Sequence, residues 1–222
     1  MSEGSANSAG RAYGGVSAVE RDGRRRRQLL DAGLLLFGNT GYRSATVRGL
    51  CREAKIADRH FYQYFAGTED LLLAVYGECM TRLTTETVAA MVRVESGDDV
   101  ESVAARGLDA FFRVMEDPQL ARVVWMEVLG VSPRVEREYL AAMTGFADLI
   151  LAHLRGMGVA VEAENDVDPE ILATAAVGGI SHTAMTWFLS GYAADRKVVV
   201  ATTARYLANI GGSLASESIT GP

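Results

Sequence analysis

The chain has 222 residues, 49% of them hydrophobic and 23% charged, and a net charge of −6. These values are typical of a globular protein and exclude collagen-like, disulfide-scaffold and wholly disordered chains. The two cysteines, Cys51 and Cys79, form no CxxC motif, which argues against a zinc site or a disulfide framework. We therefore expect one large or two small domains in the reducing cytoplasm.

Charge is distributed unevenly along the chain. Residues 23–65 carry nine basic and three acidic side chains, a net charge of +6, so the remainder carries −12. A basic segment joined to an acidic body indicates that the basic part meets a polyanion while the body has another role.

Residues 1–22 lack the apolar stretch of a signal peptide, and we interpret them as a disordered arm. After the arginine run at 24–27, apolar residues from Leu29 to Phe37 recur at helical spacing. The segment Asn39-Thr40-Gly41 ends this first predicted helix.

Two short helices follow. Thr46 is placed to cap a helix over residues 47–54, and Asp58 to cap another over residues 59–65, in which Phe61 and Phe65 face inward. Two short helices joined by a tight turn form a helix-turn-helix, whose second helix enters the major groove of DNA.

A long helix is predicted over residues 68–94, ended by the loop 95–99. Three later prolines each follow a capping residue, and proline suits the first position of a helix. Helices should therefore begin near residues 118, 133 and 169, after Asp117, Ser132 and Asp168. With periodic stretches at 100–115 and 195–211, the sequence predicts an all-α fold of about nine helices.

Residues 171–194 contain no charged side chain, and this stretch is formally long enough to span a membrane. Its polar residues, including Ser181 and His182, and the absence of flanking basic clusters favour a buried or intersubunit helix instead. We expect no membrane association.

The segment GYRSATVRGLCREAKIADRHFYQYFAGTEDLLLAVY, residues 41–76, resembles the DNA-binding domain of TetR-family transcriptional regulators. The resemblance covers residues 25–76 and implies a three-helix helix-turn-helix domain at 23–70. It further implies a helical ligand-binding and dimerisation domain at 71–215, followed by a flexible tail at 216–222.

The resemblance places DNA contacts on the two short helices. Arg48 can bind guanine through a bidentate fork, Gln63 can pair with adenine, and His60 can meet a base edge. The arginines at 24–27, in a flexible arm, can enter the minor groove or track phosphates. The predicted DNA-contacting residues are Arg24, Arg25, Arg26, Arg27, Thr46, Arg48, Arg59, His60, Tyr62, Gln63, Tyr64 and Thr68.

Two positions depart from the family pattern. Lys55 replaces the usual turn glycine and must adopt whatever backbone angle the turn requires. Thr68 replaces the usual lysine at the start of the long helix, so one phosphate contact loses its charge.

The C-terminal part is rich in aromatic residues and methionine, which can line a cavity but equally fill a helical core. The family resemblance favours a pocket, with these candidate ligand-binding residues: Phe111, Met115, Trp125, Met126, Phe146, His182, Met185 and Trp187. His153 and His182 lack the partners of a metal site, and the chain contains no Walker A, GxSxG or HExxH motif. We expect no metal, no cofactor and no catalytic residue.

The function indicated is a sequence-specific transcriptional regulator. We expect a homodimer on a pseudo-palindromic operator of double-stranded DNA, joined through residues 170–191 and 195–211 and released by a small apolar or amphipathic effector. One alternative is a helical small-molecule-binding protein or enzyme without operator binding. Another makes oxidation of Cys51 or Cys79 the trigger, although both lie on apolar helix faces that suit inert packing.

Overall fold

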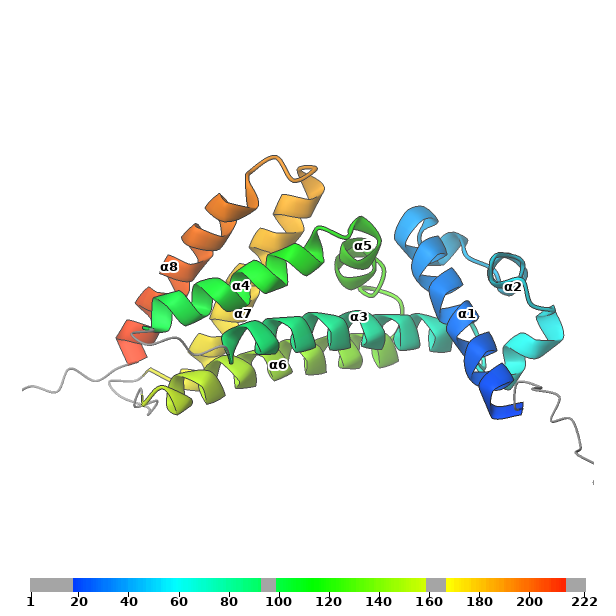
Figure 1. The fold of residues 1–222 in the computed structure, drawn as a ribbon, viewed down its shortest axis with the longest axis horizontal. Helices are drawn as coiled ribbons and strands as arrows, with labels where there is room; N and C mark the ends of the chain where they lie inside the picture. The colour runs from blue at the N-terminus through cyan, green and yellow to red at the C-terminus, as the bar shows by residue number, and fades with distance from the viewer. Residues whose placement is uncertain (1–17, 93–98, 159–166, 215–222) are drawn as a thin grey trace, which may run out of the picture.

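The computed structural model describes residues 18–92, 99–158 and 167–214, and every regular element of these residues is a helix (Figure 1). The N-terminal elements are α1 (Ala18–Thr40), η1 (Tyr42–Ser44), α2 (Val47–Ala54) and η2 (Asp58–Gln63). The remainder are α3 (Thr68–Met91), α4 (Val100–Met115), α5 (Pro118–Met126), α6 (Pro133–Gly156), α7 (Pro169–Leu189) and α8 (Arg196–Leu214). With the 3-10 helix η2 counted, the nine predicted helices are found within these residues.

The three proline-marked helices begin at the predicted residues. Asp117, Ser132 and Asp168 are the N-caps of α5, α6 and α7, and each side chain accepts a backbone N–H of the first turn. Proline then occupies the first helical position, where its missing N–H leaves no hydrogen bond unmade. The chain therefore carries its own starting signals for three helices of the C-terminal bundle.

The first helix is longer than predicted. It begins at Ala18, so residues 18–22 and the arginines at 24–27 lie on α1 rather than in a flexible arm. Arginine is a good helix former, Glu20 lies in the first turn where the helix dipole favours an acid, and Arg27 pairs with Asp31 one turn on. The predicted disordered residues 1–17 and the tail at 216–222 lie outside the described residues.

The helix-turn-helix follows α1. Thr46 caps α2 as predicted, its hydroxyl accepting the N–H of Gly49 at 3.1 Å. Lys55 ends α2 in the left-handed region, with φ of 56° and ψ of 40°. The second predicted helix is the tighter η2, since so short a segment gains little from α-helical hydrogen bonds. Asp58 is its first residue and not its N-cap, which is Ala57, so the predicted cap at Asp58 is wrong.

A large buried core runs through both halves of the chain, from Leu29 on α1 to Ala204 on α8, and a smaller buried cluster joins α6 to α7. Figure 1 shows α3 and α6 side by side along the length of the bundle; α4 packs on α3, α7 packs on α6, and α8 packs on α4 and α7. The helix α5 lies between that bundle and α1, which it contacts extensively. None of the described helices is long and apolar enough to cross a membrane.

The turn at Lys55 generates a stability prediction. A residue with a Cβ is strained in the left-handed region, and glycine is not. Lys55→Gly should therefore raise the free energy of unfolding by up to about 1 kcal/mol, although glycine's freer unfolded chain offsets part of the gain. Lys55→Val should lower it by about 1 kcal/mol or more, because a β-branched residue is least tolerant of positive φ. Denaturant unfolding measures both, and an equal stability for the two variants would contradict the strained turn.

Candidate DNA-binding surface and apolar cavity

The element η2 is held against the core by Phe61 within it and by Phe65 just after it, and it presents its polar residues. Phe61 and Phe65 are buried in the core, with ring centroids 5.9 Å apart. The side chains between and before them, Arg59, Tyr62 and Gln63, are exposed, and Tyr62 is 64% exposed. Because the two phenylalanines set the rotation of this short element, its polar face points away from the core.

Three of the predicted contact residues, His60, Gln63 and Tyr64, form hydrogen bonds within the protein. A nitrogen of the His60 ring, Nδ1, lies 3.0 Å from Oε1 of Gln63, so the two side chains orient one another. The hydroxyl of Tyr64 donates to Asp22 on α1 at 3.0 Å, which ties the end of η2 back to the first helix. Burial and the hydrogen bond to Asp22 raise the pKa of Tyr64. Tyr64 is thus half-buried, unlike its neighbours Tyr62 and Gln63.

The four consecutive arginines do not act together. Successive residues of an α-helix are rotated by about 100°, so four in a row point around most of its circumference. Arg27 forms ion pairs with Asp31 and with Glu78 on α3, and Arg26 lies 5.6 Å from the centroid of the Phe65 ring. Arg24 is exposed and Arg25 is half-buried near Tyr64. Arg27 therefore supports the fold, which the arm prediction had not foreseen.

The remaining predicted contacts lie at the two helix starts. Arg48 is exposed on the first turn of α2, and the hydroxyl of Thr46 is already used as its cap. Thr68 begins α3, where Asp70 accepts the N–H of Ala66 at 3.0 Å and pairs with Arg134 on α6. Arg134 and that N–H hold the pKa of Asp70 below its usual value. These groups stabilise the corner where the helix-turn-helix meets the body.

A buried carboxylate joins the turn after α1 to α5, a feature that the sequence analysis missed. The side chain of Glu127, the C-cap of α5, is only 10% exposed. Its Oε2 accepts the backbone N–H of Tyr42 at 2.7 Å, and its Oε1 accepts Nε of Arg122 at 2.8 Å. Gly41, with φ of 89°, passes so close that a Cβ there would lie 3.2 Å from Oε2. An acid following a hydrophobic helix gives no sequence signal for such a contact.

Close backbone packing reinforces this junction. A Cβ at Gly38 would lie 2.6 Å from Cα of Gln119 on α5, and a Cβ at Gly33 would lie 2.8 Å from Val75 on α3. No side chain fits at Gly38 without moving backbone, so α1 seats directly on α5.

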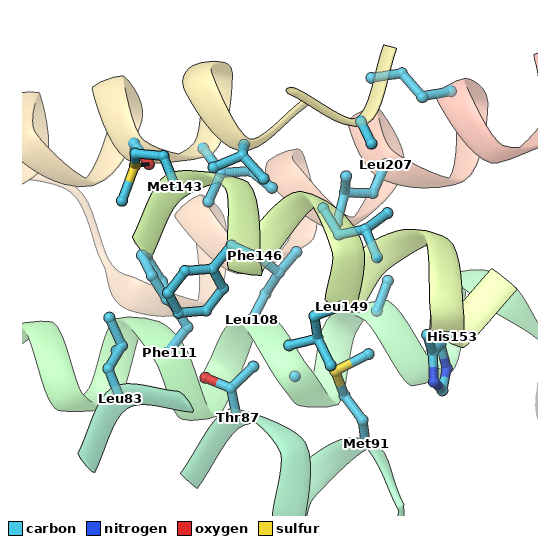
Figure 2. Close-up of a pocket in the computed structure, with 18 of the residues that line it drawn as sticks. Leu83, Thr87, Met91, Leu108, Phe111, Met143, Phe146, Leu149, His153 and Leu207 are labelled. Carbon is cyan, nitrogen blue, oxygen red and sulfur yellow. Dashed lines mark hydrogen bonds between the residues drawn. The ribbon is translucent and has the colours of Figure 1, made fainter. Parts of the chain in front are cut away.

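The C-terminal bundle contains an apolar cavity of about 1000 Å³ of empty space, including its opening (Figure 2). It is lined by α3 to α8, with Leu83, Thr87 and Met91 of α3 facing Phe146, Leu149 and His153 of α6. Among its described lining residues none is charged. Such a space suits a molecule that is mostly hydrocarbon.

The predicted ligand-binding residues are divided by this geometry. Phe111, Trp125 and Phe146 line the cavity. The other five do not: Met115 and Trp187 are buried in the core, Met185 is half-buried, and Met126 and His182 are exposed. These candidates were predicted from the size of their side chains, whereas the rotation of each helix determines which side chains line the cavity. The lining residues that were missed, such as Leu108 and Met143, have the apolar character of any core position.

The two cysteines are free and buried, and neither lines the cavity. Burial raises the pKa of Cys79 to about 12, and burial together with the nearby Asp58 raises the pKa of Cys51. Since the thiolate is the reactive form, both thiols are poor targets for oxidation. No group of three potential metal-ligating side chains occurs among the described residues.

Comparison with known proteins identifies the N-terminal unit. Residues 29–75 match the family model described as bacterial regulatory proteins, tetR family. The nicotine-responsive transcriptional repressor HdnoR of Paenarthrobacter nicotinovorans is 30% identical over 51% of this chain and 55% of its own. The match thus spans about half of that repressor. The fatty acid metabolism regulator protein of Bacillus subtilis is 22% identical over 73% of this chain and 83% of its own.

Solved structures extend the likeness to the whole fold. The fatty acid degradation regulator FadR of Bacillus halodurans superposes with a TM-score of 0.70 at 21% identity, over 85% of this chain and 95% of its own. FadR of Bacillus subtilis, solved with stearoyl-CoA, gives 0.68 at 19% identity, over 82% of this chain and 96% of its own. The predicted all-α architecture is therefore confirmed. These relatives are transcriptional regulators, in agreement with the expectation that the chain is not an enzyme.

The Glu127 contact can be tested by mutation. Glu127→Ala leaves the N–H of Tyr42 and the Arg122 guanidinium without their shared acceptor, and it should lower the free energy of unfolding by about 1–3 kcal/mol. Glu127→Gln keeps an acceptor for Tyr42 and should lose less. Denaturant unfolding measures the loss, with Glu138→Ala, an exposed acid on α6, as the control. An equal loss in Glu138→Ala would mean that the buried contact is not what stabilises the junction.

Proposed function

Because the chain belongs to the TetR family of bacterial regulatory proteins through its DNA-binding domain, we propose that it is a sequence-specific transcriptional repressor. It acts in the cytoplasm as a homodimer on a pseudo-palindromic operator, and a small apolar or amphipathic molecule releases it. One observation carries the proposal: the same two helices, α3 and α5, line the apolar cavity and contact α1 of the DNA-binding unit.

DNA recognition rests on the exposed face of the helix-turn-helix. Arg59, Tyr62 and Gln63 of η2 and Arg48 of α2 are exposed, and residues 23–65 carry a net charge of +6. Arginine and glutamine are the residues that read guanine and adenine in the major groove, and tyrosine hydroxyls bind phosphate. The positive charge favours the DNA backbone although the whole chain is acidic.

Dimerisation is supported by the outer face of α7. An uncharged stripe at helical spacing is exposed in the single chain, and its members are Ile171, Ala175, Gly178, His182, Thr186 and Leu189. Ile171 is 70% exposed and Leu189 60% exposed. Isologous packing of α7 and α8 from two chains buries this stripe and sets two recognition elements about 34–36 Å apart, or a multiple of that spacing.

Two packed helices, α3 and α5, connect the cavity to the DNA-binding unit. Met80, Leu83, Thr87 and Met91 place α3 along the cavity, and Trp125 places the end of α5 there. Elsewhere on the same two helices, Val75 of α3 packs against Gly33 of α1, and Gln119 of α5 packs against Gly38 of α1. A ligand that separates α3 from α6 or displaces Trp125 must therefore move α1, and with it the distance between the two recognition elements of a dimer.

The alternative of a helical binding protein or enzyme without an operator predicts no sequence-selective DNA binding. Selection from a random duplex pool, followed by titration of the best sequence at two salt concentrations, separates the two. We expect a pseudo-palindrome bound by a dimer, with a log–log salt slope of about −0.9 per phosphate contacted. Enrichment of no sequence at low salt would refute the repressor assignment.

Matched variants locate the contact surface. Arg48→Ala and Gln63→Ala should each weaken operator binding by about 1–3 kcal/mol and relax selectivity at one position. Arg27→Ala, which removes a charge paired with Asp31 and Glu78, is the control and should lower stability slightly while retaining operator selectivity. Loss of selectivity in Arg27→Ala alone would place the DNA contacts on α1 instead.

Release by ligand carries a reciprocal requirement. If an effector weakens operator affinity by some factor, operator must weaken effector affinity by the same factor, typically about 5- to 150-fold. Calorimetric titration of the effector into free protein and into the protein–operator complex measures both. Equal effector affinity in the two titrations would contradict the coupling while leaving DNA binding intact.

A further inference from the structure

The apolar cavity contains polar atoms that have nothing to bind. The hydroxyl Oγ1 of Thr87, Nε1 of Trp125 and Nε2 of His153 are all buried without a hydrogen-bond partner, and all three residues line the cavity. Thr87 is 7% exposed and Trp125 is 4% exposed. The remaining polar residue of the lining, Ser181, donates weakly to Sδ of Met143 at 3.7 Å.

Unpartnered polar atoms are costly in such a place. A buried donor or acceptor without a partner destabilises a protein, because it has lost its hydrogen bonds to water. A threonine inside a helix can usually donate to the carbonyl four residues earlier, as Thr81, Thr174, Thr183 and Thr202 do here, but Thr87 does not. The three residues come from α3, α5 and α6 and line a largely apolar space, which suits isolated water poorly, because a buried water needs two to four polar partners.

The chemistry of the three atoms restricts what can satisfy them. The indole N–H of Trp125 only donates, so it requires an acceptor, whereas the Thr87 hydroxyl can donate or accept. Burial, with the charge of nearby Arg106, lowers the pKa of His153, so its imidazole is neutral at pH 7 and Nε2 donates or accepts according to the tautomer. Carbonyl and hydroxyl oxygens fit all three.

A charged group does not fit the lining. Burying a carboxylate or an ammonium without an opposite charge costs far more than burying a neutral oxygen. The described lining residues include no Arg, Lys, Asp or Glu, and Arg106, whose charge acts on His153, is not among them.

The shape favours a long molecule. Lining residues on α3 extend from Met80 to Met91, about 16 Å along a helix axis. Figure 2 places Thr87 beside Phe146 and Leu108 in the body of the cavity, and His153 with Met91 toward one end. The polar residues Thr87 and His153 are therefore separated along its length.

We propose that the effector is an elongated, uncharged molecule with a hydrocarbon body and hydroxyl or carbonyl oxygens, and that Thr87 and His153 bind those oxygens. This inference rests on the proposed function and names the chemical class of its ligand. It distinguishes alcohols, ketones, esters and lactones from hydrocarbons and from ionised acids.

Thr87→Val provides the decisive variant, since it replaces a hydroxyl by a methyl group of nearly the same size. Without ligand the variant should melt at a higher temperature than the wild type, because an unpartnered buried hydroxyl is removed. Its affinity for a neutral oxygen-bearing ligand should nevertheless fall by about three- to tenfold. Thr87→Ser, which keeps the hydroxyl, should retain that affinity. Thr85→Val, an exposed position two residues earlier on α3, is the matched control and should change neither quantity.

The probes are dodecanol, dodecanone and dodecanoate, titrated at pH 7 by quenching of tryptophan fluorescence and by thermal shift. The two neutral probes should bind more tightly than dodecanoate, and only their binding should be weakened in Thr87→Val. The proposal is overturned by tighter binding of dodecanoate, by wild-type affinity of Thr87→Val for both neutral probes, or by failure of either neutral probe to bind.

Operator binding is a separate readout, and it distinguishes failure of this inference from failure of the proposed function. If dodecanoate binds and releases the operator while the neutral probes do not, the ligand class is wrong and the repressor assignment stands. If no operator is selected by the wild type, the repressor assignment fails, whatever the cavity binds.

Discussion

The seating of α1 on α5 is the contact on which the rest of the structure depends. Gly38 lets the two backbones approach so closely that a Cβ would reach Cα of Gln119, and Glu127 accepts the first N–H after the turn at Gly41. A carboxylate held between a backbone N–H and an arginine is a directional contact, and it fixes both the position and the rotation of α1. The orientation of the helix-turn-helix relative to the bundle follows from it.

This contact matters for function because α5 touches both the DNA-binding unit and the cavity. Its N-terminal turn packs on α1, and Trp125 near its C-terminus reaches the cavity. α3 makes a second connection of the same kind, from Val75 at Gly33 to Met91 at the far end of the cavity. Packed interiors are stiff, so we expect a change of cavity volume to be transmitted along both helices rather than absorbed locally. A regulator built in this way needs no flexible linker between its two halves.

The cavity departs from what stability alone would favour. If leucine filled this core, no empty space would remain. Hydrocarbon would also replace the unpartnered polar atoms of Thr87, Trp125 and His153. Proteins keep such destabilising features mainly at functional sites. The buried polar atoms and the empty volume occur together, within a bundle whose other polar groups are largely satisfied, and this coincidence connects both to a ligand.

Local signals in the sequence determined much of the fold. Asp-Pro and Ser-Pro pairs set three helix starts, Thr46 capped α2, and the spacing of Phe61 and Phe65 predicted which face of the recognition element is buried. Each of these depends on atoms within a few residues, so no tertiary information was needed. The strained turn at Lys55 was likewise anticipated, because the backbone angle belongs to the turn rather than to the residue.

Only the tertiary structure determined which side chains are exposed and which make contacts in the interior. Arg27 pairs with Glu78, a residue 51 positions away, and Glu127 meets Tyr42 across 85 positions. Met126 and His182, which the sequence suggested as ligand-binding residues, are exposed, whereas Thr87, which it did not single out, lines the cavity. The sequence by itself therefore determined an all-helical chain with an N-terminal helix-turn-helix, through capping and periodicity. The junction and the polar atoms of the cavity arise from the rotation of packed helices, which depends on contacts between residues far apart in the chain.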